Sequence, residues 1–175
     1  LFQYAFSVAE RTPSRVCFIE STGSVLSPEF RVSYNSQGFI ETAIVPFRLT
    51  ANLCNLIGFP LLDSRFALTL SNVSGVLRGS KTELTPIVKL LMRDDLLAFY
   101  TRSMPKSDTK TQEMEKQLRD RFTANAAFII GRLTECAFRP EGSNSPIDVR
   151  VSELIMTARH PENLCKMQGS YQAWL

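Results

Sequence analysis

The spacing of apolar residues divides the chain into a strand-rich start and a long helical remainder. The run "VCFIES" and the turn signal "STGS" after it predict a small hairpin that returns through Val25 and Leu26. In "EFRVSYN" apolar residues alternate with polar ones at period two, which predicts a further strand. We therefore expect residues 1–35 to be rich in strands after the end of an apolar helix.

From Val45 onward the pattern becomes helical. "VPFRLTANLCNLIG" has Thr50 as an N-cap and Gly58 as a stop. "DSRFALTLSNVSGVLRG" closes at Gly79, and "LTPIVKLLMRDDLLAFYTR" has Pro86 near its first turn, where a missing N–H costs little. The faces expected to be buried in these three helices are formed by Leu53, Leu56 and Ile57, by Phe66, Leu70, Val73 and Leu77, and by Ile87, Leu90, Leu91, Leu97 and Tyr100.

The second half is predicted to hold three more helices after the polar linker "SMPKSDTKT". The first is long, and its periodic positions are Met114, Leu118, Phe122, Ile129, Leu133 and Cys136. "RPEGSNSP" ends it, "DVRVSELIMTAR" forms the next helix, and Pro161 starts a short last one. The fold class is thus α+β and mostly α, with a short hairpin and strands followed by helices.

Composition narrows the range of partners. With 175 residues and 44% hydrophobic content the chain can bury an ordinary core, and it opens without an initiator Met or a signal peptide, as if cut from a longer protein. No run of 18 apolar residues occurs, so we expect no membrane contact. The formal charge of +3 is too small to indicate nucleic-acid binding. The basic residues Lys106, Lys110, Lys116, Arg119 and Arg121 alternate with acidic ones, which favours a solvated helix face.

Metal and cofactor chemistry has little support in the sequence. Four cysteines occur without a C-x-x-C pair, and the only histidine, His160, precedes a proline as a helix-end residue would. We expect no metal, and mostly packed, reduced thiols of a nuclear or cytosolic protein. A phosphate-binding "GxxxxGK[ST]" loop is missing, so no cofactor is predicted.

Three short motifs resemble the phosphatidylinositol 3-kinase-related kinase family. "VPFRLT" resembles the segment that opens the helical part after the activation loop of those kinases. "ERTPSR" occupies the place of the catalytic-loop motif D-R-H-P-S-N, and "PEFR" that of I-D-F-G. Arg11, Pro13, Ser14 and Phe30 match these motifs.

The residues that would carry out phosphate transfer do not match. The resemblance places Glu10 at the catalytic Asp, Thr12 at the catalytic His, Arg15 at the magnesium-binding Asn, Glu29 at the metal-binding Asp and Arg31 at the Gly. A guanidinium about 4 Å from a divalent ion is repelled by about 8 kcal/mol at an effective dielectric constant near 20. The extra methylene of Glu29 moves its carboxylate by about 1 Å, a misplacement that can cost roughly a hundredfold in rate. These substitutions predict a degenerate site and a protein that is not an enzyme.

The second half carries two further likenesses. "LLMRDDLLAFYT" resembles the family's "lRDEiiaW" helix, and residues 151–175 resemble the FATC tail. "NLCKM" and the final Trp-Leu are most similar to the TRRAP-type pseudokinases of that family. The family's "DP-W-HPW" is replaced by "QGSYQAW", which lacks the acid and the proline. The resemblance runs from about residue 9 to residue 175.

This resemblance implies a kinase-like C-lobe portion at 1–142, followed by a helical FATC domain at 143–175. It implies a nuclear, non-catalytic scaffold segment of histone acetyltransferase co-activator complexes such as SAGA, which acts in assembly and activator recruitment. The expected partners are other complex subunits and the helical repeats of its own protein, with transcription activators contacted indirectly. The proposed packing anchors are Leu154, Ile155, Leu164, Met167, Trp174 and Leu175.

Two other interpretations stay open at this point. One is a divergent active kinase of the same family that uses Glu10 and Glu29 in altered geometry. The other is a free-standing helical interaction module, which predicts that residues 1–45 fold without a preceding lobe. For each of the apolar anchors taken singly, ordinary packing in the chain's own core is the simpler alternative.

Overall fold

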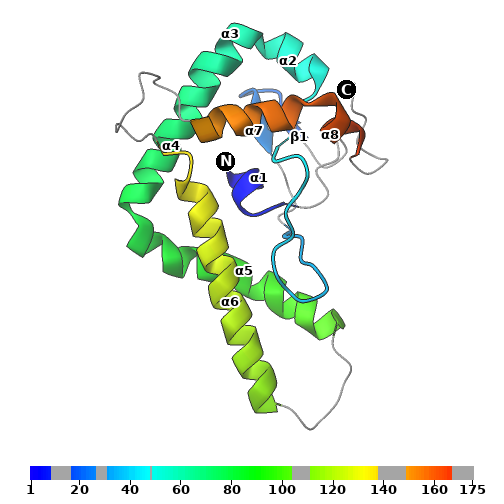
Figure 1. Cartoon of the computed structure of the whole chain (residues 1–175), viewed down its shortest axis with the longest axis vertical. Helices are drawn as coiled ribbons and strands as arrows, with labels where there is room; N and C mark the ends of the chain where they lie inside the picture. Colours follow the sequence, from blue (N-terminus) through cyan, green and yellow to red (C-terminus); the bar gives the residue numbers. More distant parts are fainter. Residues whose placement is uncertain (9–16, 27–30, 48, 104–110, 138–148, 167–175) are drawn as a thin grey trace.

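The computed structural model describes residues 1–8, 17–26, 31–47, 49–103, 111–137 and 149–166, and helices dominate them (Figure 1). The mostly helical fold is therefore confirmed. The elements in chain order are α1 (Phe2–Ala5), β1 (Cys17–Ile19), β2 (Ser24–Leu26), α2 (Ala51–Ile57), α3 (Phe59–Leu61), the π-helical turn η2 (Leu62–Phe66), α4 (Ala67–Gly79), α5 (Lys81–Ser103), α6 (Thr111–Thr134), α7 (Val149–Arg159) and α8 (Pro161–Cys165).

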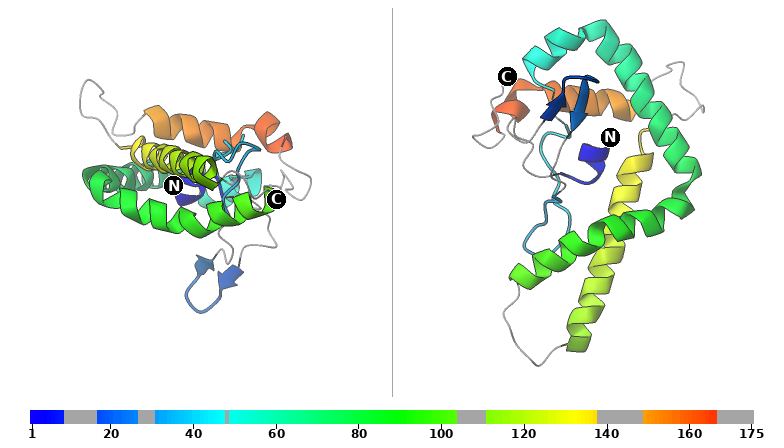
Figure 2. Two further views of the ribbon diagram at one scale, coloured as in Figure 1. Left: turned by 90° about the horizontal axis from the view of Figure 1, so that it is seen from below. Right: turned by 180° about the vertical axis from the view of Figure 1, so that it is seen from behind.

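The predicted hairpin is present as β1 and β2, two antiparallel strands with Cys17 opposite Leu26. Gly23, with φ of 64°, lies in the connecting turn, where a side chain would be strained. The hairpin projects from one side of the helical body (Figure 2). Thus β1 and β2 contribute little to the core that positions the rest of the chain.

The further predicted strand, within residues 29–35, does not form a strand in its described part. Val32 and Tyr34 each make only an isolated bridge, to Val8 and to Ile40 respectively. The Val32 N–H donates to the Asp95 side chain of α5, and the Ser33 and Asn35 N–H groups bond to two separate backbone segments, so no continuous ladder forms. Residues 27–30 of this segment lie outside the described residues.

Helix α2 begins and ends where the sequence predicts. Thr50 has an extended backbone at the N-cap, and Gly58, with φ of 81°, ends the helix in a conformation that favours glycine. A new helical segment starts at once with Phe59 and Pro60, because proline is well suited to a first turn. It continues through η2 into α4, which ends at Gly79 as predicted.

The predicted buried face of α5 is wrong. The helix buries Val88, Met92 and Leu96, which lie against the core. The predicted positions Ile87, Leu90, Leu91 and Leu97 are 41% to 69% exposed. Both sides of α5 are apolar, so its periodicity alone does not choose the side on which α6 packs. Helix α5 also begins at Lys81, which puts Pro86 inside the helix and not in its first turn.

Smaller corrections of the same kind occur in the neighbouring helices. Leu56 is 81% exposed on α2, where Cys54 is the buried residue. Val73 is exposed on α4, while Ser71 and Ser74 are buried beside Leu70. Small serine side chains let neighbouring helices approach closely, so the buried face of α4 contains polar residues beside Ala67 and Leu70.

The core consists of two clusters that meet at α1. One joins Tyr4 to the segment before α2 and to α4, α7 and α8. The other joins Ala5 and Phe6 to α5, to α6 and to the loop that contains Val32 and Ile40. In Figure 1 α1 lies at the centre, with α6 rising beside it and α7 crossing above. The N-terminal residues therefore hold the two halves of the fold together.

Candidate functional site

The described structure covers only one of the five positions compared with kinase chemistry. Glu10, Thr12, Arg15 and Glu29 lie outside the described residues. Arg31 is described, and it is exposed at the start of the loop that runs to Thr42. The degenerate catalytic site therefore stays a prediction from the sequence.

The loop at residues 31–42 is fixed by polar side chains of α5 and α6. The Val32 N–H donates to Asp95 Oδ2 at 2.8 Å. The Ile40 N–H donates to Asn125 Oδ1 at 3.0 Å, and Asn125 Nδ2 donates to the Gly38 carbonyl at 2.8 Å. Asn125 is 2% exposed, so both its side-chain oxygen and its side-chain nitrogen bind the loop backbone in a region shielded from water.

The tip of this loop is held by hydrogen bonds within the loop and by one arginine of α6. Asn35 Oδ1 accepts hydrogen bonds from the Gln37 and Phe39 N–H groups at 3.0 and 3.1 Å, an arrangement that tightens a turn. Arg121 donates to the Gln37 carbonyl and lies 4.6 Å from the centroid of the Phe39 ring. The prediction of a merely solvated face is thus wrong for Arg121, although Lys116 and Arg119 are exposed as predicted.

Arg132 of α6 contacts both the N-terminal helix and the end of the loop. Its NH1 donates to the Tyr4 carbonyl at 2.9 Å and to Ser7 Oγ at 2.7 Å, and its NH2 donates to Thr42 Oγ1 at 3.3 Å. Its guanidinium also lies 4.6 Å from the Tyr4 ring centroid and 4.3 Å from that of Phe128. Burial lowers the pKa of Arg132, an effect that nearby Tyr4 partly offsets. This side chain therefore ties α1 and the end of the loop to α6.

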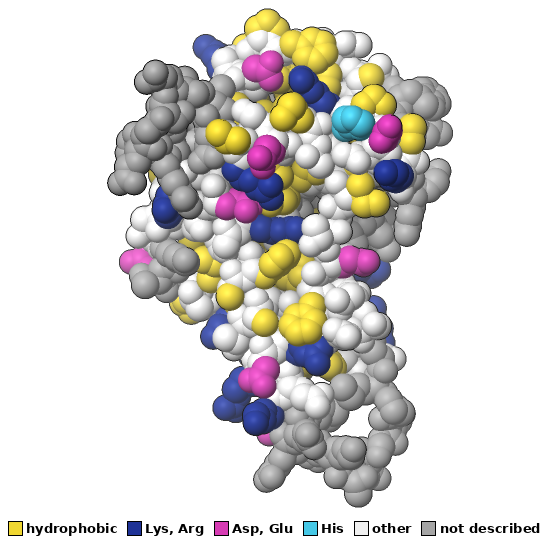
Figure 3. All heavy atoms as spheres, viewed as in Figure 1, with side chains coloured by type: hydrophobic (Ala, Val, Ile, Leu, Met, Phe, Trp, Pro, Cys, Tyr) yellow, Lys and Arg dark blue, Asp and Glu magenta, His cyan; other side chains and the backbone are white. Residues whose placement is uncertain are grey.

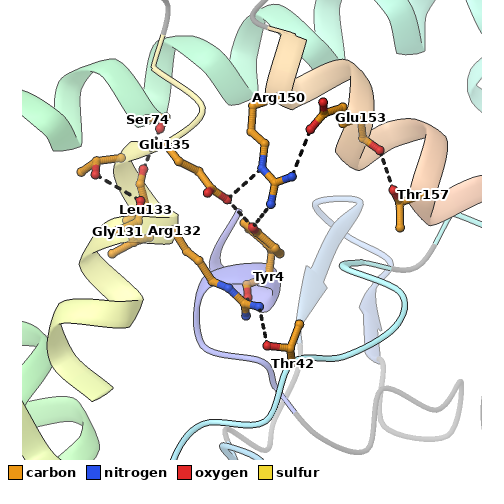
Figure 4. Close-up of polar contacts among 11 residues, drawn as sticks. Tyr4, Thr42, Ser74, Gly131, Arg132, Leu133, Glu135, Arg150, Glu153 and Thr157 are labelled. Carbon is orange, nitrogen blue, oxygen red and sulfur yellow. Dashed lines mark hydrogen bonds and ion pairs between the residues drawn. The ribbon is translucent and has the colours of Figure 1, made fainter. Parts of the chain in front are cut away.

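A second polar group joins α1 to α7, and Figure 4 shows its side chains converging. The Tyr4 hydroxyl donates to Glu135 Oε1 and accepts a hydrogen bond from Arg150 NH2 at 3.0 Å. Arg150 also pairs with Glu135 at 3.4 Å and with Glu153 at 3.1 Å. Burial, and next the hydrogen bond to Glu135, raise the pKa of Tyr4 to about 12. The phenol is therefore neutral at physiological pH.

The predicted packing anchors divide into two sets. Leu154, Ile155 and Leu164 are at most 5% exposed, and they face the core of this chain together with Tyr4 and Phe47. This is the intramolecular packing that the simpler alternative expects. Met167, Trp174 and Leu175 lie outside the described residues.

Among the described residues we find no cluster suited to bind a metal ion and no single helix suited to span a membrane. In that part of the chain no group of three His, Cys, Asp or Glu side chains is placed to hold a metal ion. Cys54 and Cys136 are buried, whereas Cys17 and Cys165 are exposed, so the predicted packing holds for two of the four. No single described helix is long and apolar enough to cross a membrane, although α2 and the segment Phe59–Gly79, bent by 83°, meet those limits as a pair.

The polar side chains described above hold the loop at 31–42 and the N-terminal helix in place. Among the described residues, Asp95, Arg121 and Arg132 bind backbone groups, and the side chains of Tyr4, Glu135, Arg150 and Glu153 bind one another. Sequence reasoning missed Asp95, Asn125 and Arg132. The only signal in the sequence was that a polar residue stands next to apolar positions on the side of the helix that is buried. Asn125, for example, directly precedes the buried Ala126.

No protein-family model matches the chain. Curated proteins do match it, at low identity but over nearly its full length. It is 24% identical to the serine-protein kinase ATM of Sus scrofa over 98% of this chain and 6% of that protein. It is 24% identical to the SAGA complex/NuA4 acetyltransferase complex subunit TRA1 of Saccharomyces cerevisiae over 98% of this chain and 5% of that protein.

A third relative is the transformation/transcription domain-associated protein of Danio rerio, which is 24% identical over the whole of this chain and 5% of its own length. The chain therefore spans about one twentieth of the length of these relatives. The relatives include a kinase and a subunit of acetyltransferase complexes. The comparisons therefore do not decide between a catalytic and a scaffolding relative. All of them are phosphatidylinositol 3-kinase-related proteins, and this chain is similar to them over nearly its whole length.

Proposed function

We propose that this chain is the non-catalytic C-terminal part of a pseudokinase in a giant scaffold subunit. Residues 1–142 would supply the C-lobe portion of the kinase-like domain, and residues 143–175 the FATC domain. The observation that carries the proposal is Arg15, which stands where the resemblance places the magnesium-binding Asn. A fixed positive charge at that point opposes binding of a divalent ion.

The other substitutions act in the same direction. Thr12 in place of the catalytic His cannot carry a proton or a positive charge at neutral pH. Glu29 in place of the Asp keeps a carboxylate, but a longer side chain places it differently. Loss of both the metal and the charge-stabilising histidine leaves no group to neutralise a transferred phosphoryl group.

The anchored loop supports an architectural role. It follows directly after the segment compared with I-D-F-G, and its backbone is held by buried Asn125 and by Asp95. Regulated kinases switch such a segment between ordered and disordered states. A loop fixed through buried amide hydrogen bonds is costly to release, because each group would be left unpaired.

Membership of a co-activator complex is proposed from the relatives. TRA1 is by name a subunit of the SAGA and NuA4 acetyltransferase complexes. We infer that this chain assembles with subunits of such a complex in the nucleus, and that activators are contacted through other parts of the same protein. Direct binding to nucleic acid or membranes and the use of a cofactor are not part of the proposal.

The proposal is tested in the intact protein by affinity purification of the complex. Arg15→Ala and Glu29→Ala are expected to leave the recovered subunits unchanged, since neither side chain has a catalytic task. Deletion of residues 167–175 is expected to reduce recovery. If instead Glu29→Ala reduces recovery and the deletion has no effect, the architectural role is wrong.

A divergent active kinase is the second candidate, and the similarity to the kinase ATM favours it. It would require Glu10 to serve as base and Glu29 to hold magnesium. The two candidates differ most clearly in magnesium-dependent nucleotide binding, which only the active kinase requires.

A further inference from the structure

An apolar hollow of about 720 Å³ opens between α2 and α3 on one side and α7 and α8 on the other. Its wall includes Cys54, Phe59, Met156 and Leu164. Figure 3 shows hydrophobic side chains around the single histidine, His160, which also lines the hollow. The volume lies within the range of sites that bind drug-sized molecules, about 300–1,000 Å³.

The hollow carries one positive charge and no negative one among its described residues. Arg159 is the single Lys, Arg, Asp or Glu side chain in that part of the wall. Its guanidinium lies 5.7 Å from the centroid of the Phe59 ring, so this side chain reaches from α7 to α3. Burial raises the pKa of the Cys54 thiol, and the charge of Arg159 partly opposes this rise. The guanidinium is therefore held close to the apolar wall.

Arg159 forms no ion pair with a described carboxylate. The ion pairs between described residues join Arg150 to Glu135 and to Glu153. Asn55 of α2 lines the same hollow, and its side-chain amide can donate hydrogen bonds to an anion. A guanidinium is suited to bind a carboxylate through two parallel hydrogen bonds. The polar groups of this hollow thus match an acidic group.

We propose that the hollow binds a small molecule with one carboxylate and a long aliphatic body, such as a fatty acid. The aliphatic body lies against Phe59, Met156 and Leu164, and the carboxylate pairs with Arg159. An inorganic anion would leave the apolar wall open to water, and a neutral hydrocarbon would leave the guanidinium without a partner. The two features together therefore select a molecule that has both parts.

The site is independent of the proposed pseudokinase function. It uses neither the segments compared with the catalytic motifs nor a contact with another subunit. An active kinase with the same helices would contain the same hollow, so failure of one proposal leaves the other unaffected.

Photoaffinity labelling of the intact protein tests the site. The probe is dodecanoic acid that carries a diazirine at the end of its chain, and labelled peptides are identified by mass spectrometry. We expect labels on peptides that contain Phe59 or Met156. Unlabelled decanoate should compete about tenfold less well than dodecanoate, because it buries two methylenes fewer. Dodecanol, which has the same chain and no charge, should also compete about tenfold less well.

Variants separate the acidic group from the aliphatic body. Arg159→Gln is expected to abolish the preference for dodecanoate over dodecanol. Met156→Trp fills the hollow without adding a charge and is expected to lower labelling about tenfold. Val76→Trp is the matched control, because Val76 is 72% exposed on α4 and does not line the hollow. If Arg159→Gln does not accumulate, the comparison of dodecanoate with dodecanol in the natural sequence decides the role of the charge.

Four results would overturn the proposal. They are labels only on other peptides, equal competition by dodecanol and dodecanoate in the natural sequence, equal labelling of Met156→Trp and Val76→Trp, and binding to phosphatidylserine vesicles without labelling by the dissolved probe. The last result would assign the surface to a membrane and not to a single small molecule.

Discussion

Arg132 NH1 lies 2.9 Å from the Tyr4 carbonyl oxygen, and its guanidinium lies 4.6 Å from the Tyr4 ring centroid. One side chain of α6 therefore binds both the backbone and the aromatic ring of α1. Through Thr42 Oγ1 it also reaches the end of the anchored loop. Helix α1, the loop at 31–42 and α6 are thus joined through one buried cation.

Removing this cation is expected to destabilise the fold strongly. Arg132→Ala removes one of the two donors to the Tyr4 carbonyl and the donor to Ser7 Oγ, at a cost of about 3 kcal/mol in the free energy of unfolding. Arg132→Lys keeps the charge but not the planar fork, and should cost about half as much. Urea unfolding measures both values, with the exposed Lys116→Ala as control. A loss for Arg132→Ala no larger than that of the control would contradict this role.

Asn125→Ala tests whether α6 holds the loop. The substitution removes the hydrogen bonds to the Ile40 N–H and the Gly38 carbonyl, so the amides of residues 38–40 should exchange with solvent about tenfold faster or more. Hydrogen-exchange mass spectrometry measures this change. Thr123→Ala serves as control, because its hydroxyl bonds only within α6 and at the surface. Unchanged protection of the loop in Asn125→Ala would show that other contacts hold it.

Gly38 is expected to tolerate no side chain unless Tyr100 changes with it. Its φ is 81°, and a Cβ there would lie 2.6 Å from the Tyr100 hydroxyl oxygen. Gly38→Ala should cost about 2 kcal/mol or more, from backbone strain and the clash together. In a Tyr100→Phe background the contact with the hydroxyl oxygen is gone and the nearest ring carbon lies 3.1 Å away, so the cost should fall. A double-mutant cycle by urea unfolding checks this, and additive effects would mean that the two residues do not meet.

Alkaline pH is expected to weaken the fold through Tyr4. Its pKa in the folded chain is about 12, above the ordinary value of 10.0, because burial and Glu135 disfavour the phenolate. The neutral phenol thus contributes its full stabilisation below pH 10, and this contribution is lost as the pH rises from 10 through 12. Urea unfolding across this range should show a falling free energy, with a smaller slope in Tyr4→Phe.

Tyr34→Phe is the companion measurement. Burial, and next Asp95, also raise the pKa of Tyr34, so this variant too should reduce the alkaline slope. At neutral pH the two variants should differ. The Tyr34 hydroxyl is buried without a hydrogen-bond partner in the described structure, so its loss should be neutral or stabilising, whereas Tyr4→Phe breaks two hydrogen bonds. Equal losses at neutral pH would contradict the assignment of these partners.

The helix ends were predictable because local chemistry sets them. Thr50, Gly58, Gly79 and Pro161 mark boundaries that the structure keeps. Each acts through its own backbone or its nearest neighbours, so no knowledge of the tertiary fold is needed. The small hairpin was also predictable from local sequence, because a turn signal lies between two short apolar runs.

The buried face of α5 was not predictable, because it depends on a partner distant in sequence. Val88 and Ile87 are both apolar, and only the packing of α6 decides that Val88 is 2% exposed and Ile87 54% exposed. The contacts of Asp95 and Asn125 with the loop likewise join residues 63 and 85 positions apart. Sequence patterns report periodicity, but they do not report which remote backbone groups need a partner.

The central claim is that this chain has no phosphotransfer site, and magnesium-dependent nucleotide binding tests it most directly. The intact protein would be titrated with ATP in the presence and absence of magnesium, alone and as Arg15→Asn and Glu29→Ala. We predict no magnesium-dependent binding in the natural sequence or in Glu29→Ala. Binding that requires magnesium and is abolished by Glu29→Ala would contradict the account and favour an active kinase.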